Sequence, residues 1–176
     1  MRDIWVTSDW HLNHEKFLSF TDSEGKKVRP FSNVNEMNEC ILDRHNERVK
    51  KGDKSWNLGD VFFGDKEWFK SNITKFNGSK RLVVGNHDDV KFLSQGGFFQ
   101  KVHLERVWED MLFTHRPAHE SGLFNARTGK TRINVHGHTH SNGSPEGPYH
   151  SVCLEMTDYY PVNLEELRDE LRKKFA

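Results

Sequence analysis

Short apolar runs alternate with longer amphipathic stretches along the first half of the chain. The runs end at polar or glycine-containing segments, which is typical of buried strands. Between them, apolar side chains recur every three or four residues, a spacing that predicts helices. Strands are therefore expected near 4–7, 55–58 and 81–84, and helices near 14–20, 34–50, 66–76 and 89–95.

Three helices begin with residues suited to cap a helix N-terminus. Asn33 and Asn163 each stand three residues before a glutamate, the spacing of a capping box. Asp65 directly precedes another helix and is also suited to cap it. The last of these helices, expected over 164–175, has its acids first and its bases last, which suits the helix dipole.

The second half of the chain is richer in strands. Consecutive apolar stretches without a helical spacing predict hairpins, whereas the alternation in the first half predicts a parallel sheet. The chain is therefore predicted to be α/β, with two sheets and helices outside them. Further strands are expected near 102–107, 111–114, 133–135 and 149–156, with a turn at 109–110 and a long, lid-like loop over 116–131.

Composition narrows the class of protein. The 176 residues suit one domain, assigned to 1–176. The formal net charge is zero, so neither long duplex nucleic acid nor a membrane is an expected partner. The apolar stretch from Ile4 to Val6 is too short for a signal peptide, which favours a cytoplasmic location. Cys40 and Cys153 have no ligand spacing and are expected to be small buried hydrophobes.

Side chains that bind metals follow the expected strands, and loops at one end of a sheet lie together. A set of Asp, His and Asn without Cys suits Mn, Fe, Co, Ni or Zn more than a structural zinc. One ion needs about four to six ligands, so a larger set favours two ions that share a carboxylate. The candidate ligands are Asp9, His11, Asp60, Asn86, His115, His138 and His140.

At these positions the sequence resembles the calcineurin-like metallophosphoesterase family. That family's pattern is Asp-x-His, Gly-Asp, Gly-Asn-His-Asp/Glu, a lone His and Gly-His-x-His. All five pieces occur here in that order between residues 9 and 140. The resemblance is closest to small bacterial and phage-type phosphoesterases without a cap domain. It implies a four-layer α/β/β/α sandwich of two mixed sheets.

The resemblance also implies a role for each residue. A hydroxide that bridges two divalent ions, with Mn the favoured element, would attack phosphorus in line. His87 would protonate the leaving oxygen, and Asp88 would hold the His87 loop or its imidazole. One ion would be held by Asp9, His11 and His140 and the other by Asn86, His115 and His138, with Asp60 bridging the two.

Phe63 departs from the family pattern. Many relatives carry Asp or Tyr three residues after the bridging aspartate, where this chain has Phe63. The Tyr version marks the iron-binding purple acid phosphatases, so Phe63 argues against that subgroup. Without an aspartate at this position, the site lacks a side chain that helps to position the ligands, but the ligands themselves are unchanged.

Several polar residues beside the ligands are candidate substrate contacts. Arg116 could clamp a phosphate oxygen in bidentate fashion, or be solvated surface. The basic residues of 26–29 are expected to lie on a solvated face. The candidate contacts are Asn13, His14, Arg116 and His119.

The leading hypothesis is a metal-dependent phosphoesterase acting on phosphodiesters or cyclic nucleotides. An alkoxide leaving group needs protonation, which His87 can supply, and an uncapped domain leaves the groove open for a small phosphate ester such as a nucleotide. One alternative is a phosphomonoesterase acting on a small metabolite or nucleotide. Another is a non-catalytic interaction scaffold, as in the retromer subunit that resembles this family. A nuclease would be limited to short or single-stranded substrates, because the neutral chain offers no platform for duplex.

Overall fold

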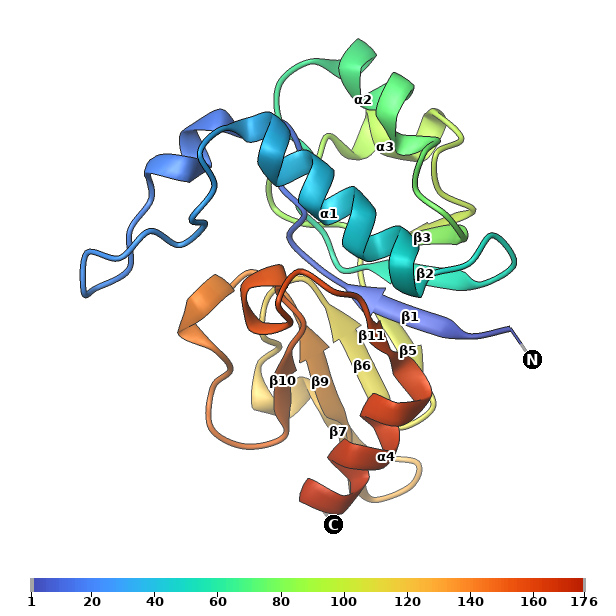
Figure 1. Ribbon diagram of the computed structural model, residues 1–176. Helices are drawn as coiled ribbons and strands as arrows, with labels where there is room; N and C mark the ends of the chain where they lie inside the picture. Colours follow the sequence, from blue (N-terminus) through green and yellow to red (C-terminus); the bar gives the residue numbers. More distant parts are fainter. Residues whose placement is uncertain (1, 176) are drawn as a thin grey trace.

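Two mixed β-sheets face each other in the computed structural model, which describes residues 2–175 (Figure 1). The first sheet has the strand order β11-β1-β2-β3-β4. Strands β1 to β4 are parallel, and β11 is antiparallel to β1. The strands are β1 (Ile4–Thr7), β2 (Lys54–Asn57), β3 (Ser79–Val83), β4 (Lys101–His103) and β11 (Val162–Asn163).

The second sheet has the order β10-β9-β6-β5. Strands β10, β9 and β6 are parallel, and β5 is antiparallel to β6. The predicted fold class, α/β with two mixed sheets, is therefore confirmed. The strands are β5 (Arg106–Trp108), β6 (Met111–Thr114), β9 (Ile133–His136) and β10 (Tyr149–Ser151).

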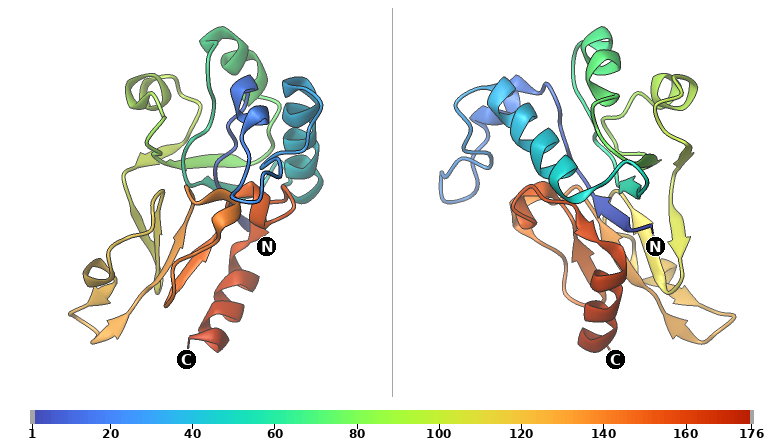
Figure 2. Two further views of the ribbon diagram at one scale, coloured as in Figure 1. Left: turned by 90° about the vertical axis from the view of Figure 1, so that its left-hand side faces the viewer. Right: turned by 45° about the vertical axis from the view of Figure 1, so that its right-hand side comes forward.

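Three helices cover the outer face of the first sheet, and α4 lies alongside the second sheet (Figures 1 and 2). The predicted caps form: the side chains of Asn33, Asp65 and Asn163 each accept a hydrogen bond from a backbone N–H in the first helical turn. No helix within residues 2–175 is both long and apolar enough to cross a membrane. The helices are α1 (Val34–Arg48), α2 (Lys66–Ile73), α3 (Val90–Gln95) and α4 (Leu164–Lys174), with 3-10 turns η1 (Glu15–Ser19), η2 (Glu120–Gly122), η3 (His140–Asn142) and η4 (Leu154–Met156).

The buried side chains form two clusters, one on each face of the first sheet. One cluster packs α1, α2 and α3 against the sheet, with Met37, Phe69 and Leu93 among its members. The other fills the space between the sheets, where Val6 meets Phe113 and the leucines of α4. The first sheet is therefore buried on both faces, which suits its parallel strands.

Three of the predicted elements need correction. The apolar stretch 102–107 is two strands, because the chain crosses from β4 in the first sheet to β5 in the second at the exposed Leu104. The strand expected over 149–156 ends at Ser151, and the short β11 was not predicted. The expected loop 116–131 carries η2 and a hairpin of β7 (Phe124–Asn125) and β8 (Lys130–Thr131).

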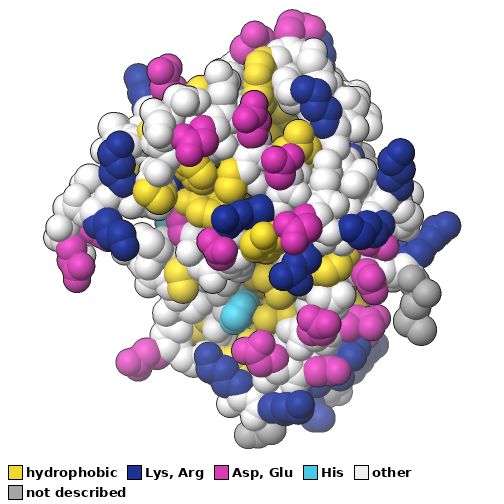
Figure 3. All heavy atoms as spheres, in the orientation of Figure 1, with side chains coloured by type: hydrophobic (Ala, Val, Ile, Leu, Met, Phe, Trp, Pro, Cys, Tyr) yellow, Lys and Arg dark blue, Asp and Glu magenta, His cyan; other side chains and the backbone are white. Residues whose placement is uncertain are grey.

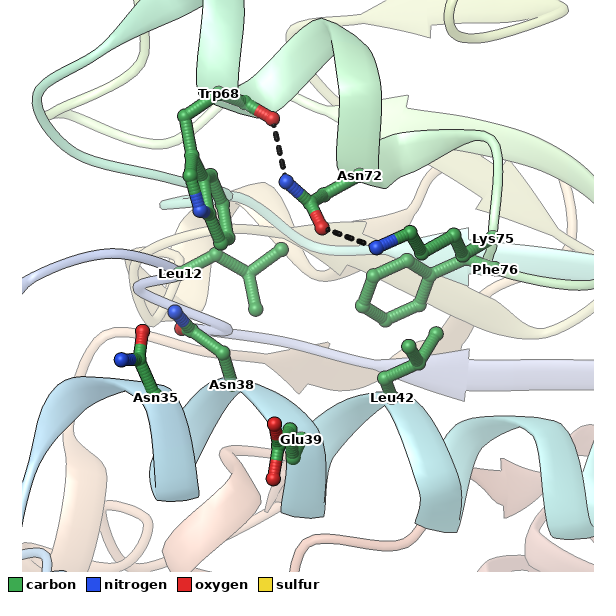
Figure 4. A pocket seen from close by; sticks show the side chains of 9 residues that line it. All are labelled: Leu12, Asn35, Asn38, Glu39, Leu42, Trp68, Asn72, Lys75 and Phe76. Atoms are coloured by element: carbon green, nitrogen blue, oxygen red, sulfur yellow. Dashed lines mark hydrogen bonds between the residues drawn. The ribbon is translucent and has the colours of Figure 1, made fainter.

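A small pocket of about 140 Å³ lies between α1 and α2 (Figure 4). The Asn72 side chain donates to the Trp68 carbonyl and accepts from Lys75 Nζ at its rim. Asn38 Oδ1 accepts the backbone N–H of Asn13, which ties α1 to the loop after β1. None of the predicted metal ligands lines this pocket.

His45 is a buried histidine on α1. Its Nε2 lies 3.0 Å from the Asn77 carbonyl oxygen, and its Nδ1 has no hydrogen-bond partner among the described residues. Burial lowers the pKa of His45 to about 4 from an ordinary value of 6.5. Between these values the unfolded chain binds this proton and the folded chain does not, so stability falls as the pH drops from about 6.5 to about 4.

We expect His45→Gln to remove this part of the pH dependence. The wild-type free energy of unfolding should lose about 2–3 kcal/mol more than that of the variant between pH 7 and pH 4.5. Urea unfolding at the two pH values measures the difference, with the exposed His119→Gln as control. An equal loss in wild type and His45→Gln would contradict the assignment.

Candidate metal centre

The predicted ligands meet where strands of both sheets end. Asp9, Asp60 and Asn86 follow the carboxyl ends of β1, β2 and β3, and His115 and His138 follow β6 and β9. Parallel strands place such loops at one edge. Facing sheets therefore bring together residues that lie far apart in sequence.

Two groups of possible metal ligands form there. Within each group, the donor atoms lie within 4.8 Å of one another. Their carboxylates and imidazoles fit divalent metal ions. The groups are Asp9, His11 and His140, and Asp60, His115 and His138.

Asp60 lies between the two groups. Its Oδ2 is 3.7 Å from His11 Nε2 and 3.4 Å from His115 Nε2. Asn86 belongs beside the second group, because its Oδ1 is 2.9 Å from His115 Nε2. The structure thus brings the predicted ligands together in two groups with Asp60 between them, and their assignment to two ions stays a prediction.

Hydrogen bonds orient two of the imidazoles. His115 Nδ1 lies 2.8 Å from the Leu58 carbonyl oxygen, so it carries the proton and leaves Nε2 toward Asp60. His140 Nδ1 lies 3.1 Å from Glu155 Oε1, which turns its Nε2 toward the ligand groups. Such contacts fix the tautomer and orientation of a metal-binding histidine.

Two buried atoms of the first group have no hydrogen-bond partner in the described part of the chain: Asp9 Oδ1 and His11 Nε2. They lie 3.7 Å apart. Buried polar atoms are normally paired, because leaving one unpaired costs about 1–3 kcal/mol. A cation between these two atoms would satisfy both.

The electrostatics of the site favour deprotonated ligands. Burial raises the pKa of Asp9 and of Asp60, but the neighbouring histidines outweigh it and hold both below their usual value. Burial, together with Arg29 and His140, lowers the pKa of His11 despite the opposing effect of Asp9. His115 is the exception, because Asp60 and Asp9 outweigh its burial and raise its pKa. A metal ion that binds His115 Nε2 would have to displace the proton from that nitrogen.

Five of the seven candidate ligand residues adopt left-handed backbone conformations. The φ angles are 57° at Asp9, 48° at His11, 54° at Asp60, 70° at His138 and 48° at His140. Such angles are uncommon outside glycine, although Asp, Asn and His tolerate them best. Strained backbone gathers at functional sites, and here it coincides with the ligand groups.

The motif glycines are needed because backbone and ligands approach closely. A Cβ on Gly85 would collide with Asp60, and a Cβ on Gly137 would collide with Ser8 and Asp9. Neither glycine has a positive φ, so the reason for glycine here is space.

Arg29 and Glu155 form a buried ion pair behind the first group, which sequence reasoning missed. Arg29 was expected on a solvated face, but it is fully buried. Its guanidinium donates to the carbonyl oxygens of Asp9 and Trp10, and its Nε lies 2.7 Å from Glu155 Oε1. Burial raises the pKa of Glu155, but Arg29 and His140 outweigh it and lower the pKa to about 2.

The cysteine expectation also needs correction. Cys40 is half-buried rather than buried. Cys153 is buried, but its Sγ lies 3.3 Å from Asp9 Oδ2 and donates to it. Burial and the charge of Asp9 raise the pKa of the Cys153 thiol. It therefore stays protonated, and the donor set stays nitrogen and oxygen.

The two predicted catalytic residues lie in different surroundings. His87 is exposed, and its backbone N–H donates to Asp60 Oδ1 at 2.9 Å. The Asp88 carboxylate accepts the backbone N–H groups of Gly85, Asp60 and Val61. Asp88 was expected to hold either the His87 loop or the His87 imidazole. These hydrogen bonds fit the first of the two roles.

A cleft of about 710 Å³ opens over the ligand groups and reaches His87. Phe17, Phe20 and Phe63 supply aromatic walls, and no Lys or Arg lines it. The outer wall comes from residues 14–28, on the segment that Arg29 anchors. The 116–131 loop contributes no lining residue.

Two of the predicted substrate contacts lie near the ligands. His14 lines the cleft and stacks on Phe63, with ring centroids 3.8 Å apart. The exposed Arg116 has its Nε 3.3 Å from Asn86 Oδ1, beside the second group.

Asn13 and His119 do not line the cleft. The backbone N–H of Asn13 is bonded to Asn38. His119 Nδ1 lies 2.9 Å from Ser121 Oγ and caps η2 within its own loop. Sequence proximity to a ligand was the only signal for these two residues.

Comparisons with known proteins agree with the fold. The chain is 29% identical over 175 residues to an uncharacterized protein of Methanocaldococcus jannaschii, covering 94% of this chain and 89% of that one. It matches the structure of an Aquifex aeolicus protein of unknown function with a TM-score of 0.70 at 23% identity, over 96% and 99% of the two chains. No family model matches the sequence.

Two weaker structural likenesses are also found. One is Vps29 of Entamoeba histolytica, with a TM-score of 0.41 at 16% identity over 85% of this chain and 72% of that one. Another is a predicted phosphoesterase of Streptococcus pneumoniae, with a TM-score of 0.33 at 18% identity over 86% and 71%.

Replacing Gly85 by alanine should disrupt the metal centre. The added Cβ would push against Asp60, and overpacking of this kind costs about 1–3 kcal/mol. Gly52→Ala is the matched control, because its Cβ would meet nothing within 4 Å. Calorimetric titration with Mn²⁺ should show weaker binding only in Gly85→Ala. Equal affinity in both variants would argue against close packing at Gly85.

Neutralising Glu155 should weaken metal binding without removing a ligand. Glu155→Gln keeps the shape but loses the charge that orients His140 and pairs with Arg29, and such changes typically reduce metal affinity about 10–100-fold. Glu146→Gln, on the exposed loop before β10, is the control. Titration with Zn²⁺ measures the effect, and unchanged affinity in Glu155→Gln would contradict this role.

Proposed function

We propose that the protein is a metal-dependent phosphoric ester hydrolase that binds two divalent ions. The observation that carries this proposal is the position of Asp60, whose Oδ2 lies within 3.7 Å of His11 Nε2 and 3.4 Å of His115 Nε2. One carboxylate can therefore serve both ligand groups. Paired ions supply an activated water and neutralise phosphoryl oxygens in such reactions.

His87 is the proposed general acid. It lines the cleft beside Asp60 and is exposed, so its imidazole can reach a bound ester. Protonation of the leaving oxygen by a positioned side chain is worth about 10²–10⁴ in rate. Asp88 supports this role indirectly, because its carboxylate ties the start of the His87 loop at Gly85 to Asp60 on the neighbouring loop.

The proposed substrates are phosphodiesters, including cyclic nucleotides. The cleft, at about 710 Å³, has room for far more than a phosphoryl group, and three phenylalanines line it. The absence of Lys and Arg from its lining disfavours substrates with further phosphates. An uncharged aromatic group beside the reacting phosphate fits these walls best.

The proposed ions are Mn²⁺ or a similar divalent metal. The donors are carboxylate, imidazole and amide groups, which suit Mn, Fe, Co, Ni and Zn. The protonated Cys153 leaves the set without a thiolate.

The proposal is tested by hydrolysis of bis-nitrophenyl phosphate and nitrophenyl phosphate. Metal-stripped protein refilled with Mn²⁺, Ni²⁺ or Zn²⁺ should turn over the diester faster than the monoester. Asp60→Asn should lose the activity. On a cyclic nucleotide, whose leaving group needs a proton, His87→Ala should lose about 10²–10⁴ in kcat while metal affinity is kept.

His119→Ala is the control, because its side chain lies outside the cleft. Faster turnover of the monoester would favour a phosphomonoesterase. No turnover with any metal, in protein that binds two ions per chain, would contradict hydrolysis and favour a scaffold.

A further inference from the structure

A third concave surface lies along the β4 edge of the first sheet. It is a pocket of about 170 Å³. Lys54 and Lys101 begin β2 and β4, whereas the metal ligands follow the other ends of the parallel strands. Since β4 and β5 are the edge strands of their sheets, we call this surface the edge pocket. Its lining includes Lys54, Arg81, Lys101, Arg106, His103 and Trp56.

The edge pocket gathers four cations without an acid. In the strand register, Trp56 pairs with Arg81 and Arg81 pairs with Lys101, so two like charges occupy neighbouring strands, which are about 4.8 Å apart. No carboxylate lines the pocket. Within residues 2–175, none of the four cations lies within 4.0 Å of a carboxylate oxygen. The only side chain hydrogen-bonded to Arg81 is the neutral Gln100.

His103 reports the resulting positive potential. Burial lowers its pKa, and Arg106, Lys101 and Arg81 lower it further. Every charged group that shifts His103 is therefore a cation. Its Nε2 has no hydrogen-bond partner among the described residues.

This concentration of charge is unusual for the chain. The net charge is zero, and the face in Figure 3 intersperses Lys and Arg with Asp and Glu. Like charges on neighbouring strands are destabilising unless a counter-ion offsets them. The Arg81 guanidinium is also held over the Trp56 ring, 5.7 Å from its centroid, which orients it before any ligand arrives.

We propose that the edge pocket binds a phosphate group. A tetrahedral dianion matches clustered lysines and an oriented arginine, whose guanidinium can bind two phosphate oxygens at once. The pocket, at about 170 Å³, has room for a phosphate group. The same chemistry is presented by free phosphate and by the backbone of a single-stranded nucleic acid. This site does not depend on the proposed hydrolase activity.

The test follows the His103 ring signals of the full-length protein by NMR during titration with inorganic phosphate and, separately, with a short oligothymidylate. His103 lines the edge pocket, and the comparison with Arg81→Gln separates binding there from binding at the metal centre. We expect saturable shifts, and about 10- to 100-fold weaker binding in Arg81→Gln and in Lys101→Gln. Lys91→Gln, which removes a cation from the exposed side of α3, should bind as wild type does.

The folded stability provides a second readout. Without phosphate, Arg81→Gln should raise Tm, because it removes a like-charge neighbour of Lys101. With phosphate, Tm should rise in wild type and not in the variant. Shifts with phosphate alone would assign the pocket to free phosphate, and shifts with the oligonucleotide would assign it to a nucleic-acid backbone. No shift with either probe, or equal shifts in Arg81→Gln, would overturn the proposal and leave these cations as guards against edge-strand pairing.

Discussion

The left-handed backbone of five candidate ligand residues is the constraint on which the geometry of the candidate metal centre depends. Each such residue costs about 1–3 kcal/mol, so the surrounding structure must hold it. Pairing between the loops after β1 and β2 does this, because the N–H groups of Asp9 and His11 donate to the carbonyl oxygens of Gly59 and Asp60. The N–H of His138 donates to Asp9 Oδ2, which ties the second sheet to the first. The geometry of the site therefore depends on how the two sheets are positioned against each other.

Buried groups of both charges surround Asp9. Arg29 lies behind the ligand groups and is held by Glu155, while the histidines surround the two aspartates from the cleft side. A buried charge without a partner is strongly destabilising, so Arg29 requires Glu155, and the orientation of His140 follows from the same carboxylate. Arg29 ends the segment that forms the outer wall of the cleft. Its hydrogen bond to the Trp10 carbonyl therefore attaches this wall to the loop that carries Asp9 and His11.

Local sequence signals were sufficient for much of the fold and for placing the candidate ligands after strands. Helix caps such as Asn33 depend on neighbouring residues, and ligands such as Asp60 follow recognisable strands. Contacts between distant segments could not be predicted: Arg29 looked like one more surface cation until its partner Glu155, 126 residues away, was placed beside it. The division of 102–107 into β4 and β5 likewise depends on the arrangement of the sheets, because both halves have the same apolar pattern.

The central claim is that Asp60 joins two metal positions. Anomalous difference density from crystals soaked in Mn²⁺ tests it most directly. The account predicts two peaks about 3.5–4 Å apart, with Asp60 between them. One peak should lie against the group that contains His11 and the other against the group that contains His115. A single peak, or peaks that do not share Asp60, would contradict the account.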